Sequence, residues 1–384
     1  MSRTIWRSAL WFIGAFAIIA PVDAVRFIPL GDPPGRTFLP HGISSEGNVV
    51  VGAGISASGG EAFRWTEANG IFGLGDLPGG YFYSEAYNAS ADGTMVVGRS
   101  VVDNAFEAFR WTSVGGMVGL GDLPDGLFSS SAYDISADGS VVVGAGHGAD
   151  GPEAFIWKKS AGMVGLGGLP GGYDYSAASG VSANGSVIVG GAYGPYGRDL
   201  AFRWTEYSGM VALGDLPGGR DRSRALATSA DGNVVVGWSS SARSFNNEVF
   251  LWTDFNGMVG LGDLPGGILD SIAYDVSADG GVVVGAGVGS EGHEAFRWTP
   301  TGGMESIKAI LMEGGIDLEG WQLTDATGIS ADGSTVTGRG VSPDGQTQAW
   351  VADLRTVIPT PGTLWLISVA IVGLILARTR IWQY

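Results

Sequence analysis

Aspartate recurs at two fixed positions along the chain, once in the element Leu-Gly-Asp and once in Ala-Asp-Gly. The first set is Asp32, Asp76, Asp122, Asp215 and Asp263, and the second is Asp92, Asp138, Asp231, Asp279 and Asp332. Repeated carboxylates suggest calcium, which takes about six to eight oxygen ligands. However, no Asp-x-Asp-x-Asp-Gly loop occurs, and a tight turn is a sufficient reason for Asp before Gly. We therefore expect no cofactor, with weakly bound calcium as the alternative.

Other residue types that perform chemistry are sparse. The sequence has no cysteine, and its three histidines, His41, His147 and His293, are too scattered for a metal-binding pair on one helix. It contains neither a Gly-x-Ser-x-Gly element nor a phosphate-binding loop. Paired carboxylates that hydrolyse glycosides face each other at a defined separation, whereas these aspartates recur at regular intervals along the chain. The sequence therefore predicts no catalytic residues.

The sequence varies most directly after the recurring element Leu-Pro-Gly-Gly. The five variable segments are Tyr81-Phe82-Tyr83, Leu127-Phe128-Ser129, Tyr173-Asp174-Tyr175, Arg220-Asp221-Arg222 and Ile268-Leu269-Asp270, each followed by serine. Aromatic side chains on loops suit sugar faces or protein hot spots. The ligand-binding candidates are Tyr81, Phe82, Tyr83, Phe128, Tyr173, Tyr175, Arg220 and Arg222. In the alternative interpretation, the rings fold over the edges of the repeat units as packing.

Seven tryptophans mark a tandem repeat that positions these segments. They are Trp65, Trp111, Trp157, Trp204, Trp252, Trp298 and Trp350, at spacings of 46, 46, 47, 48, 46 and 52 residues. A period in this range is that of a propeller blade. The sequence predicts an all-β fold, a seven-bladed β-propeller over residues 25–354, with a seven-unit solenoid as the alternative. In a closed ring, residues 27–30 and 348–352 must lie near each other.

Each repeat unit contains four strand-like segments. In the unit that ends at Trp298 they cover residues 258–264, 273–277, 282–287 and 294–299. Asp-Gly between the second and third segments accepts the positive φ angles of a tight hairpin, so these strands pair antiparallel. The third is apolar without alternation, which indicates burial on both faces. In the fourth, Phe63 and Trp65 share a face, and we expect such aromatic pairs to pack blade against blade.

Composition excludes one class of partner. The formal net charge is −17, and the body between the two termini is more acidic still because Arg3, Arg7, Arg378 and Arg380 lie at the ends. Binding to phosphate groups requires clustered lysine and arginine. We therefore expect no nucleic-acid partner.

The N-terminus has the pattern of an export signal. Arg3 and Arg7 precede an apolar run over residues 9–20, which is shorter than the roughly 20 residues of a membrane span. Small or β-branched residues then stand at Val22 and Ala24. We predict a signal peptide over residues 1–24 that signal peptidase removes after Ala24. The alternative is an uncleaved anchor.

The C-terminus has the opposite order of features. A linker over residues 355–363 contains Pro359, Thr360 and Pro361, and an apolar segment with Arg378 and Arg380 follows over residues 364–384. The basic end should stay cytoplasmic and the body outside. This tail resembles the PEP-CTERM sorting signal, although Thr360 replaces the usual glutamate. The resemblance implies recognition by an exosortase in the inner membrane of a Gram-negative bacterium. A plain C-terminal transmembrane anchor is the alternative.

The repeated elements Ala-Phe-Arg-Trp, Leu-Gly-Asp-Leu-Pro-Gly-Gly and Ser-Ala-Asp-Gly resemble the HAF-repeat family of probable extracellular proteins, over about residues 25–354. Two departures stand out. Ile156 replaces arginine in the third unit, and residues 307–321 replace the Leu-Pro-Gly-Gly element in the last unit, where 305–312 are expected to form a helical turn or two. The resemblance implies a surface or extracellular location and little about activity.

The sequence therefore favours an exported, cell-surface or extracellular-matrix-associated repeat protein that acts as a binding or structural module. Its expected partners, besides signal peptidase and exosortase, are an extracellular polysaccharide or a surface protein, and the membrane through the C-terminal tail. The alternatives are a secreted propeller enzyme acting on glycans as a glycosidase or lyase, and a membrane-tethered sensor module.

Overall fold

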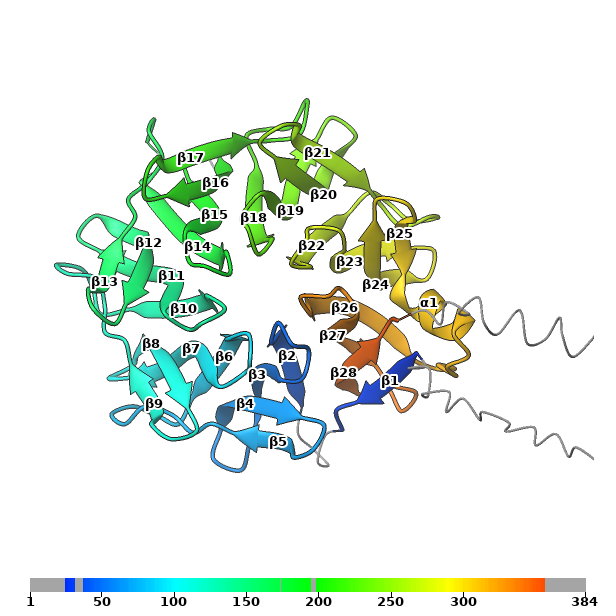
Figure 1. Ribbon diagram of the computed structural model, residues 1–384, viewed down its shortest axis with the longest axis horizontal. Coiled ribbons are helices and arrows are strands. Elements are labelled where there is room, and N and C mark those ends of the chain that lie inside the picture. Colours follow the sequence, from blue (N-terminus) through cyan, green and yellow to red (C-terminus); the bar gives the residue numbers. More distant parts are fainter. Residues whose placement is uncertain (1–24, 32–36, 173, 195–197, 356–384) are drawn as a thin grey trace, which may run out of the picture. The chain divides into compact units, whose positions relative to one another are not determined.

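The computed structural model describes residues 25–31, 37–172, 174–194 and 198–355, and all of its elements lie in one compact unit, Val25–Arg355. The predicted signal peptide, sorting motif and membrane tail fall outside these residues. The unit is a β-propeller of seven four-stranded antiparallel sheets around a central axis (Figure 1). This confirms the predicted all-β fold with seven blades and four antiparallel strands per blade.

Each blade is a meander that runs outward from the axis. The innermost strands are β2 (Phe38–Ile43), β6 (Ser84–Ala89), β10 (Ser130–Ile135), β14 (Tyr175–Val181), β18 (Ser223–Thr228), β22 (Ser271–Val276) and β26 (Gln322–Ile329). The second strands are β3 (Val50–Ile55), β7 (Met95–Val102), β11 (Val141–Gly148), β15 (Val187–Tyr193), β19 (Val234–Ser241), β23 (Val283–Gly289) and β27 (Thr335–Val341). The third strands are β4 (Gly60–Thr66), β8 (Ala105–Thr112), β12 (Gly151–Lys158), β16 (Asp199–Thr205), β20 (Ser244–Thr253), β24 (Gly292–Thr299) and β28 (Thr347–Asp353). The outermost strands are β5 (Gly70–Gly73), β9 (Gly116–Gly119), β13 (Gly162–Gly165), β17 (Gly209–Gly214), β21 (Gly257–Gly262), β25 (Gly303–Ser306) and β1 (Arg26–Pro29).

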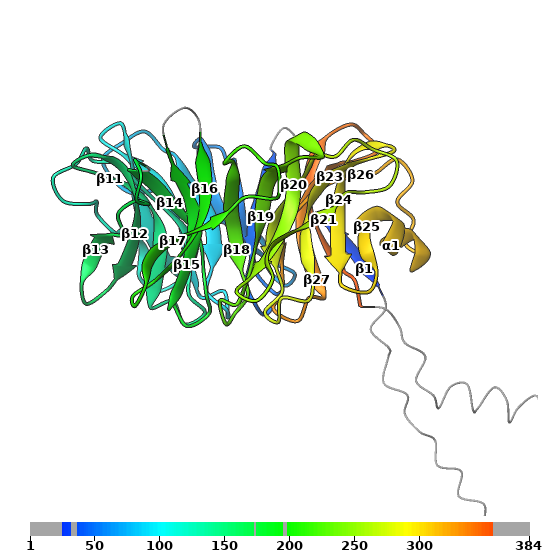
Figure 2. The same cartoon turned by 90° about the horizontal axis from the view of Figure 1, so that it is seen from above.

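The strands run between two faces of the ring (Figure 2). We call one the loop face, because it carries the loops from each outermost strand to the next innermost strand, including residues 74–83. We call the other the turn face, because it carries the Ser-Ala-Asp-Gly turns such as 90–93. The hairpins between third and outermost strands also lie on the turn face, since strand direction alternates within each blade.

Backbone hydrogen bonds join the turns into a closed ring on the turn face. The Ala91 N–H donates to the Ala137 carbonyl, and the same bond recurs from blade to blade until Ala331 donates to Ser45, while Glu46 donates to Ala91. The seven distances lie between 2.8 and 3.1 Å. The Ala-Asp-Gly element therefore links neighbouring blades as well as turning the chain.

Apolar side chains fill the spaces between blades. In each of the first six blades, the phenylalanine of the third strand, from Phe63 to Phe296, is 0% exposed. Phe109, for example, packs with Val51 and Ala62 of the preceding blade, as predicted for the phenylalanines. The tryptophans divide into two groups. Trp65, Trp111 and Trp350 are buried at 6%, 8% and 0%, whereas those of the third to sixth blades are half-buried.

The ring closes through the chain ends of the described unit. β1 pairs antiparallel with β28, with Arg26 opposite Asp353 and Pro29 opposite Trp350 (Figure 1). The Phe27 ring lies 5.2 Å from that of Trp321 and 6.2 Å from that of Trp350. This confirms the expected proximity of residues 27–30 and 348–352. The repeat unit is offset from the blade, however, because its first strand is the outermost strand of the preceding blade.

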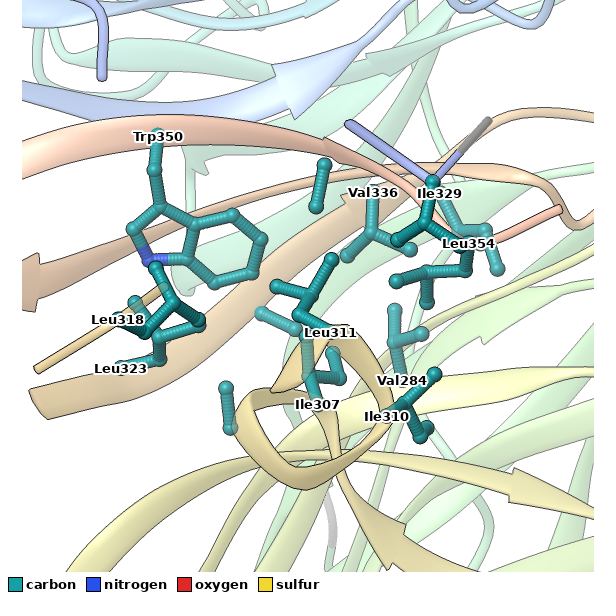
Figure 3. Close-up of a cluster of buried hydrophobic side chains, with 14 residues drawn as sticks. Val284, Ile307, Ile310, Leu311, Leu318, Leu323, Ile329, Val336, Trp350 and Leu354 are labelled. Carbon is teal, nitrogen blue, oxygen red and sulfur yellow. The ribbon is translucent and has the colours of Figure 1, made fainter. Parts of the chain in front are cut away.

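The last connection between blades contains the only α-helix among the described residues, α1 (Ile307–Glu313). It begins two residues later than predicted, because Glu305 and Ser306 still belong to β25. Ile307 and Leu311 are fully buried, and Figure 3 shows them with Leu318 and Leu323 beside Trp350. No helix within the described ranges is both long and apolar enough to cross a membrane.

Candidate functional site

The variable loops all lie on the loop face, because each joins an outermost strand to the next innermost strand. The structure therefore brings the predicted candidates to one side of the ring. The exposed candidates are Tyr81 (58%), Phe128 (46%), Tyr175 (47%), Arg220 and Arg222, the half-buried ones are Phe82 and Tyr83, and Tyr173 lies outside the described residues.

Two of the predicted tyrosines pack against the preceding blade. The Tyr83 ring lies over Gly60, where an added Cβ would come within 2.6 Å of it, and Tyr175 lies over Gly151 at 2.2 Å. The Tyr83 hydroxyl also donates a hydrogen bond of 2.5 Å to Glu85. The packing interpretation therefore accounts for the positions of the Tyr83 and Tyr175 rings. Tyr81 and Phe128 are the better candidates for ligand contact.

The serine that follows each variable segment holds the loop in place. The Ser84 hydroxyl accepts the Ala62 N–H at 2.9 Å and donates to the Gly75 carbonyl at 2.6 Å, so it connects its own blade to the preceding one. The same pair of bonds recurs at Ser130, Ser176, Ser223 and Ser271. This constant support allows the segments between to vary while their positions stay fixed.

The repeated aspartates are also engaged within the repeat. Asp92 Oδ1 accepts the Ser90 hydroxyl at 2.8 Å and the Thr94 N–H at 3.0 Å, and these hydrogen bonds lower the pKa of Asp92. In the Leu-Gly-Asp set, Asp263 Oδ2 accepts the Asp270 N–H at 3.1 Å across its loop. Over the described residues, no group of three or more acidic or histidine side chains is placed to hold a metal ion.

A row of aromatic rings lines the inner wall of the propeller. Each innermost strand has a β-bulge, and the bulged residues of the first three blades are His41, Tyr87 and Tyr133. The Tyr87 ring centroid lies 5.3 Å from that of His41 and 5.3 Å from that of Tyr133. Glycine makes the bulge possible, since a Cβ at Gly98 would lie 1.9 Å from the bulged strand's carbonyl oxygen.

A charged network connects this row to the loop face. Glu85 accepts hydrogen bonds from Tyr83, from Tyr87 at 2.6 Å and from the Arg99 Nε at 2.8 Å. Burial raises the pKa of Glu85, but these donors outweigh it and leave that pKa below its usual value. The Arg99 guanidinium lies 4.0 Å from the Phe106 ring centroid. Glu85 is therefore a charged structural acceptor with its oxygens occupied.

A small cavity of about 110 Å³ lies on the axis beside the turns of the turn face, and Asp134 and Asp275 are among its lining residues. Asp134 Oδ2 accepts the Val181 N–H at 2.7 Å and Asp275 Oδ2 accepts the Ile329 N–H at 2.9 Å, both from the next blade. Burial raises the pKa of Asp134 to about 6 and that of Asp275 to about 7. Because small-molecule sites measure about 300–1,000 Å³, the cavity is too small for a sugar ring.

Sequence reasoning missed the inner-wall row, although a signal for it exists. Tyr87, Tyr133 and Tyr274 each follow an alanine at the same position of the repeat. A tyrosine that recurs directly after this alanine indicates a side chain with its own space. The glycine opposite the bulge also recurs, directly after the apolar run of the second strand, as at Gly98 and Gly144, but it lies on the paired strand and not beside the tyrosine.

No protein-family model matches the chain, and no curated protein sequence matches it. Solved structures are similar in fold. An oligogalacturonate lyase in complex with manganese is 14% identical with a TM-score of 0.54, covering 88% of this chain and 94% of that one. The β-propeller domain of the Trilobed protease from Pyrococcus furiosus, described as having an open velcro topology, is 10% identical with a TM-score of 0.53, covering 84% and 99%. A likeness at this identity supports the propeller fold alone.

Proposed function

We propose that the chain is an exported surface module that binds an extracellular polysaccharide through its loop face. The proposal rests on one observation, the exposure of large apolar side chains in four of the five variable segments on that face. They are Leu127 (68%), Ile268 (62%), Tyr81 (58%), Tyr175 (47%) and Phe128 (46%). Because loops on a rigid scaffold commonly bind ligands, and because these apolar side chains lie in the segments that vary between repeats, this face is the contact surface that we propose.

A saccharide suits this surface better than a charged ligand. The exposed rings offer flat apolar faces, which stack on the C–H faces of sugars. The Tyr81 ring also has aromatic neighbours on this face, since it lies 6.2 Å from the Tyr83 ring, and the Tyr83 ring lies 6.1 Å from that of Phe106. A chain of sugars can therefore contact exposed rings of neighbouring variable segments, with Tyr81 supported from behind by Tyr83.

The alternative of a secreted propeller enzyme has less support, although oligogalacturonate lyases share the fold. The carboxylates that line the axial cavity, and Glu85 of the inner wall, already accept hydrogen bonds within the protein. Asp134 and Asp275 accept backbone hydrogen bonds in a cavity too small for a sugar, and Glu85 is held by Tyr87 and Arg99. General acid catalysis requires a carboxyl group that can reach the leaving oxygen.

Glycan-array binding tests the contact surface. Tyr81→Ala and Phe128→Ala should each weaken binding of the array ligand by about 0.5–1.5 kcal/mol, because each removes one stacking ring. The unfolding temperature should stay unchanged, since both rings are largely exposed. Phe255→Ala is the matched control, because Phe255 is 95% exposed but lies in a turn-face hairpin. Equal losses in all three variants, or the absence of any array ligand, would contradict the proposal.

Export is the second part of the proposal and rests on the sequence alone. Residues 1–24 have the order of a signal peptide, and the tail with Pro359, Thr360, Pro361, Arg378 and Arg380 resembles an exosortase-recognised sorting signal. Mass spectrometry of the mature protein should find Val25 as its first residue. A mature protein that retains Met1 would exclude removal by signal peptidase.

A further inference from the structure

A groove of about 1,030 Å³ crosses the turn face from the second to the fifth blade. It passes the position where Ile156 departs from the repeat. In the first and fourth blades, the equivalent arginines donate to a glycine carbonyl of the next turn, Arg64 to Gly93 at 3.1 Å and Arg203 to Gly232 at 3.2 Å. Ile156 has no donor to span the gap to the next blade. The irregularity of the repeat therefore coincides with an open groove.

Cations slightly outnumber carboxylates along the groove, although the protein as a whole is acidic: the lining has four lysine and arginine side chains against three aspartate and glutamate side chains. Lys158 and Lys159, two of the three lysines in the sequence, line the groove, and within the described ranges neither side chain forms a hydrogen bond or ion pair. The Arg110 guanidinium lies 5.9 Å from the Trp157 ring centroid, and its Nη1 donates only to the Met95 sulfur at 3.7 Å. These cations are available to a ligand.

Three carboxylates, Asp138, Asp231 and Glu206, also line the groove; the first two are already hydrogen-bonded within their own turns, and among the residues that the structure describes none of the three forms an ion pair with either lysine. Asp138 accepts the Ser136 hydroxyl at 2.8 Å and the Ser140 N–H at 2.9 Å. Asp231 has equivalent bonds, and hydrogen bonding lowers the pKa of both groups. Because none of the carboxylates described along the groove is paired with a lysine, a ligand anion does not have to displace one.

Aromatic rings accompany the cations. Trp157 and Trp204 line the groove and are half-buried, unlike the fully enclosed Trp350. Tyr207, also in the groove, is fully exposed at 101%. Exposed rings beside free ammonium groups combine two recognition modes, stacking and charge pairing. The groove volume is at the upper end of the range for small-ligand sites, which suits several linked sugar units.

We infer that this groove binds a carboxylated polysaccharide, whose sugar faces contact the rings of Trp157, Trp204 and Tyr207 and whose carboxylates pair with Lys158 and Lys159. The site lies on the turn face, so it is separate from the loop-face surface of the proposed function. An acidic peptide would satisfy the lysines, but its side chains lack the flat C–H faces that stack on exposed rings.

Calorimetric titration of the full-length chain tests the inference. The probes are alginate, a polymer of uronic acids, dextran as a neutral polysaccharide, and polyglutamate as an acidic peptide. Alginate should bind more weakly as the NaCl concentration rises, because salt screens exposed charges. Dextran should not bind in the groove. Lys158→Gln and Lys159→Gln should each weaken alginate binding roughly 1.5- to 5-fold at low salt, and Tyr207→Ala about 2- to 10-fold.

Two matched controls should leave alginate binding unchanged. Lys308→Gln removes the remaining lysine, which pairs with Glu291 at 3.4 Å, and Phe255→Ala removes an exposed ring at the corresponding position of the next blade. The inference is overturned if alginate does not bind, or if the groove variants bind like the controls. Polyglutamate binding with the same affinity and the same loss in Tyr207→Ala would exclude the saccharide. Loss of alginate binding in Tyr81→Ala alone would move the site to the loop face.

Discussion

Replacing Ser84 with alanine tests whether one buried hydroxyl holds two neighbouring blades together. The Ser84 hydroxyl accepts the Ala62 N–H at 2.9 Å and donates to the Gly75 carbonyl at 2.6 Å. Ala62 is 0% exposed, so its N–H cannot bind water once the hydroxyl is gone. Gly75 is half-buried, and its carbonyl can be hydrated instead. The substitution therefore leaves one buried donor without a partner.

The expected loss follows from these two groups. A buried donor left without a partner costs about 1–3 kcal/mol, and the lost bond to the Gly75 carbonyl adds about 0.5–1.5 kcal/mol. Ser84→Ala should therefore lower the free energy of unfolding by about 2–4 kcal/mol. With an unfolding entropy of about 2 cal/mol/K per residue over Val25–Arg355, this corresponds to a fall in Tm of roughly 3–6 °C.

Urea unfolding followed by tryptophan fluorescence measures this loss. Ser113→Ala is the matched control, because Ser113 is exposed on the turn face, and it should change stability by less than about 0.5 kcal/mol. Ser223→Ala should reproduce the loss in the fifth blade, where Ser223 accepts the Ala201 N–H at 3.0 Å and donates to the Gly214 carbonyl at 2.5 Å. If Ser84→Ala behaves like Ser113→Ala, the buried bonds do not stabilise the blade junction and the reasoning is wrong.

Two further predictions concern ring closure and pH. Phe27→Ala should cost about 2–4 kcal/mol in urea unfolding, because it removes the ring that contacts Trp350 at the closing strand, whereas Phe255→Ala should cost almost nothing; equal effects would argue against closure through β1. The raised pKa values of Asp134 and Asp275, about 6 and about 7, mean that the folded state holds these protons more tightly than the unfolded state. Their stabilising contribution is complete below about pH 4 and is lost progressively as pH rises from there through 6 and 7. The free energy of unfolding should therefore fall by a few kcal/mol between about pH 4 and pH 7. Asp275→Asn should flatten this dependence, and an unchanged slope of unfolding free energy against pH would contradict the assignment.

The architecture could be predicted from the sequence because every blade repeats the same physical constraints. The buried Val141-Val142-Val143 run, the Asp-Gly turn and the Phe-Trp strand each limit one element, and seven copies agree with one another. The burial of the tryptophans was less predictable than that of the phenylalanines. Trp111 and Trp157 occupy equivalent positions, but one is 8% exposed and the other is half-buried, because exposure depends on the outermost strands and hairpins beside them.

The candidate site was predictable only in part. The position of the variable segments on one face follows from strand order. Which side chains within one segment are exposed and which are packed does not. Tyr81 and Tyr83 are two residues apart, yet Tyr81 is 58% exposed while Tyr83 lies over Gly60 and bonds to Glu85. Glu85 is only two residues further along the chain, but Gly60 belongs to the preceding blade. A side chain's exposure in a loop therefore depends on neighbours that the local sequence does not name.

The offset between repeat and blade has a physical origin that periodicity cannot reveal. A period gives the length of a unit but not where it starts, so the six spacings between the seven tryptophans are equally consistent with any starting strand. The starting strand becomes fixed only at the ends of the unit, where β1 supplies the outermost strand that β26, β27 and β28 lack.

A ring that closes in this way joins its two ends by the four paired residues of β1, so unfolding of the first strand exposes the edge of the last blade. Because that edge includes the buried Trp350, separation of the two ends also uncovers part of the core, and this couples the stability of the first blade to that of the seventh.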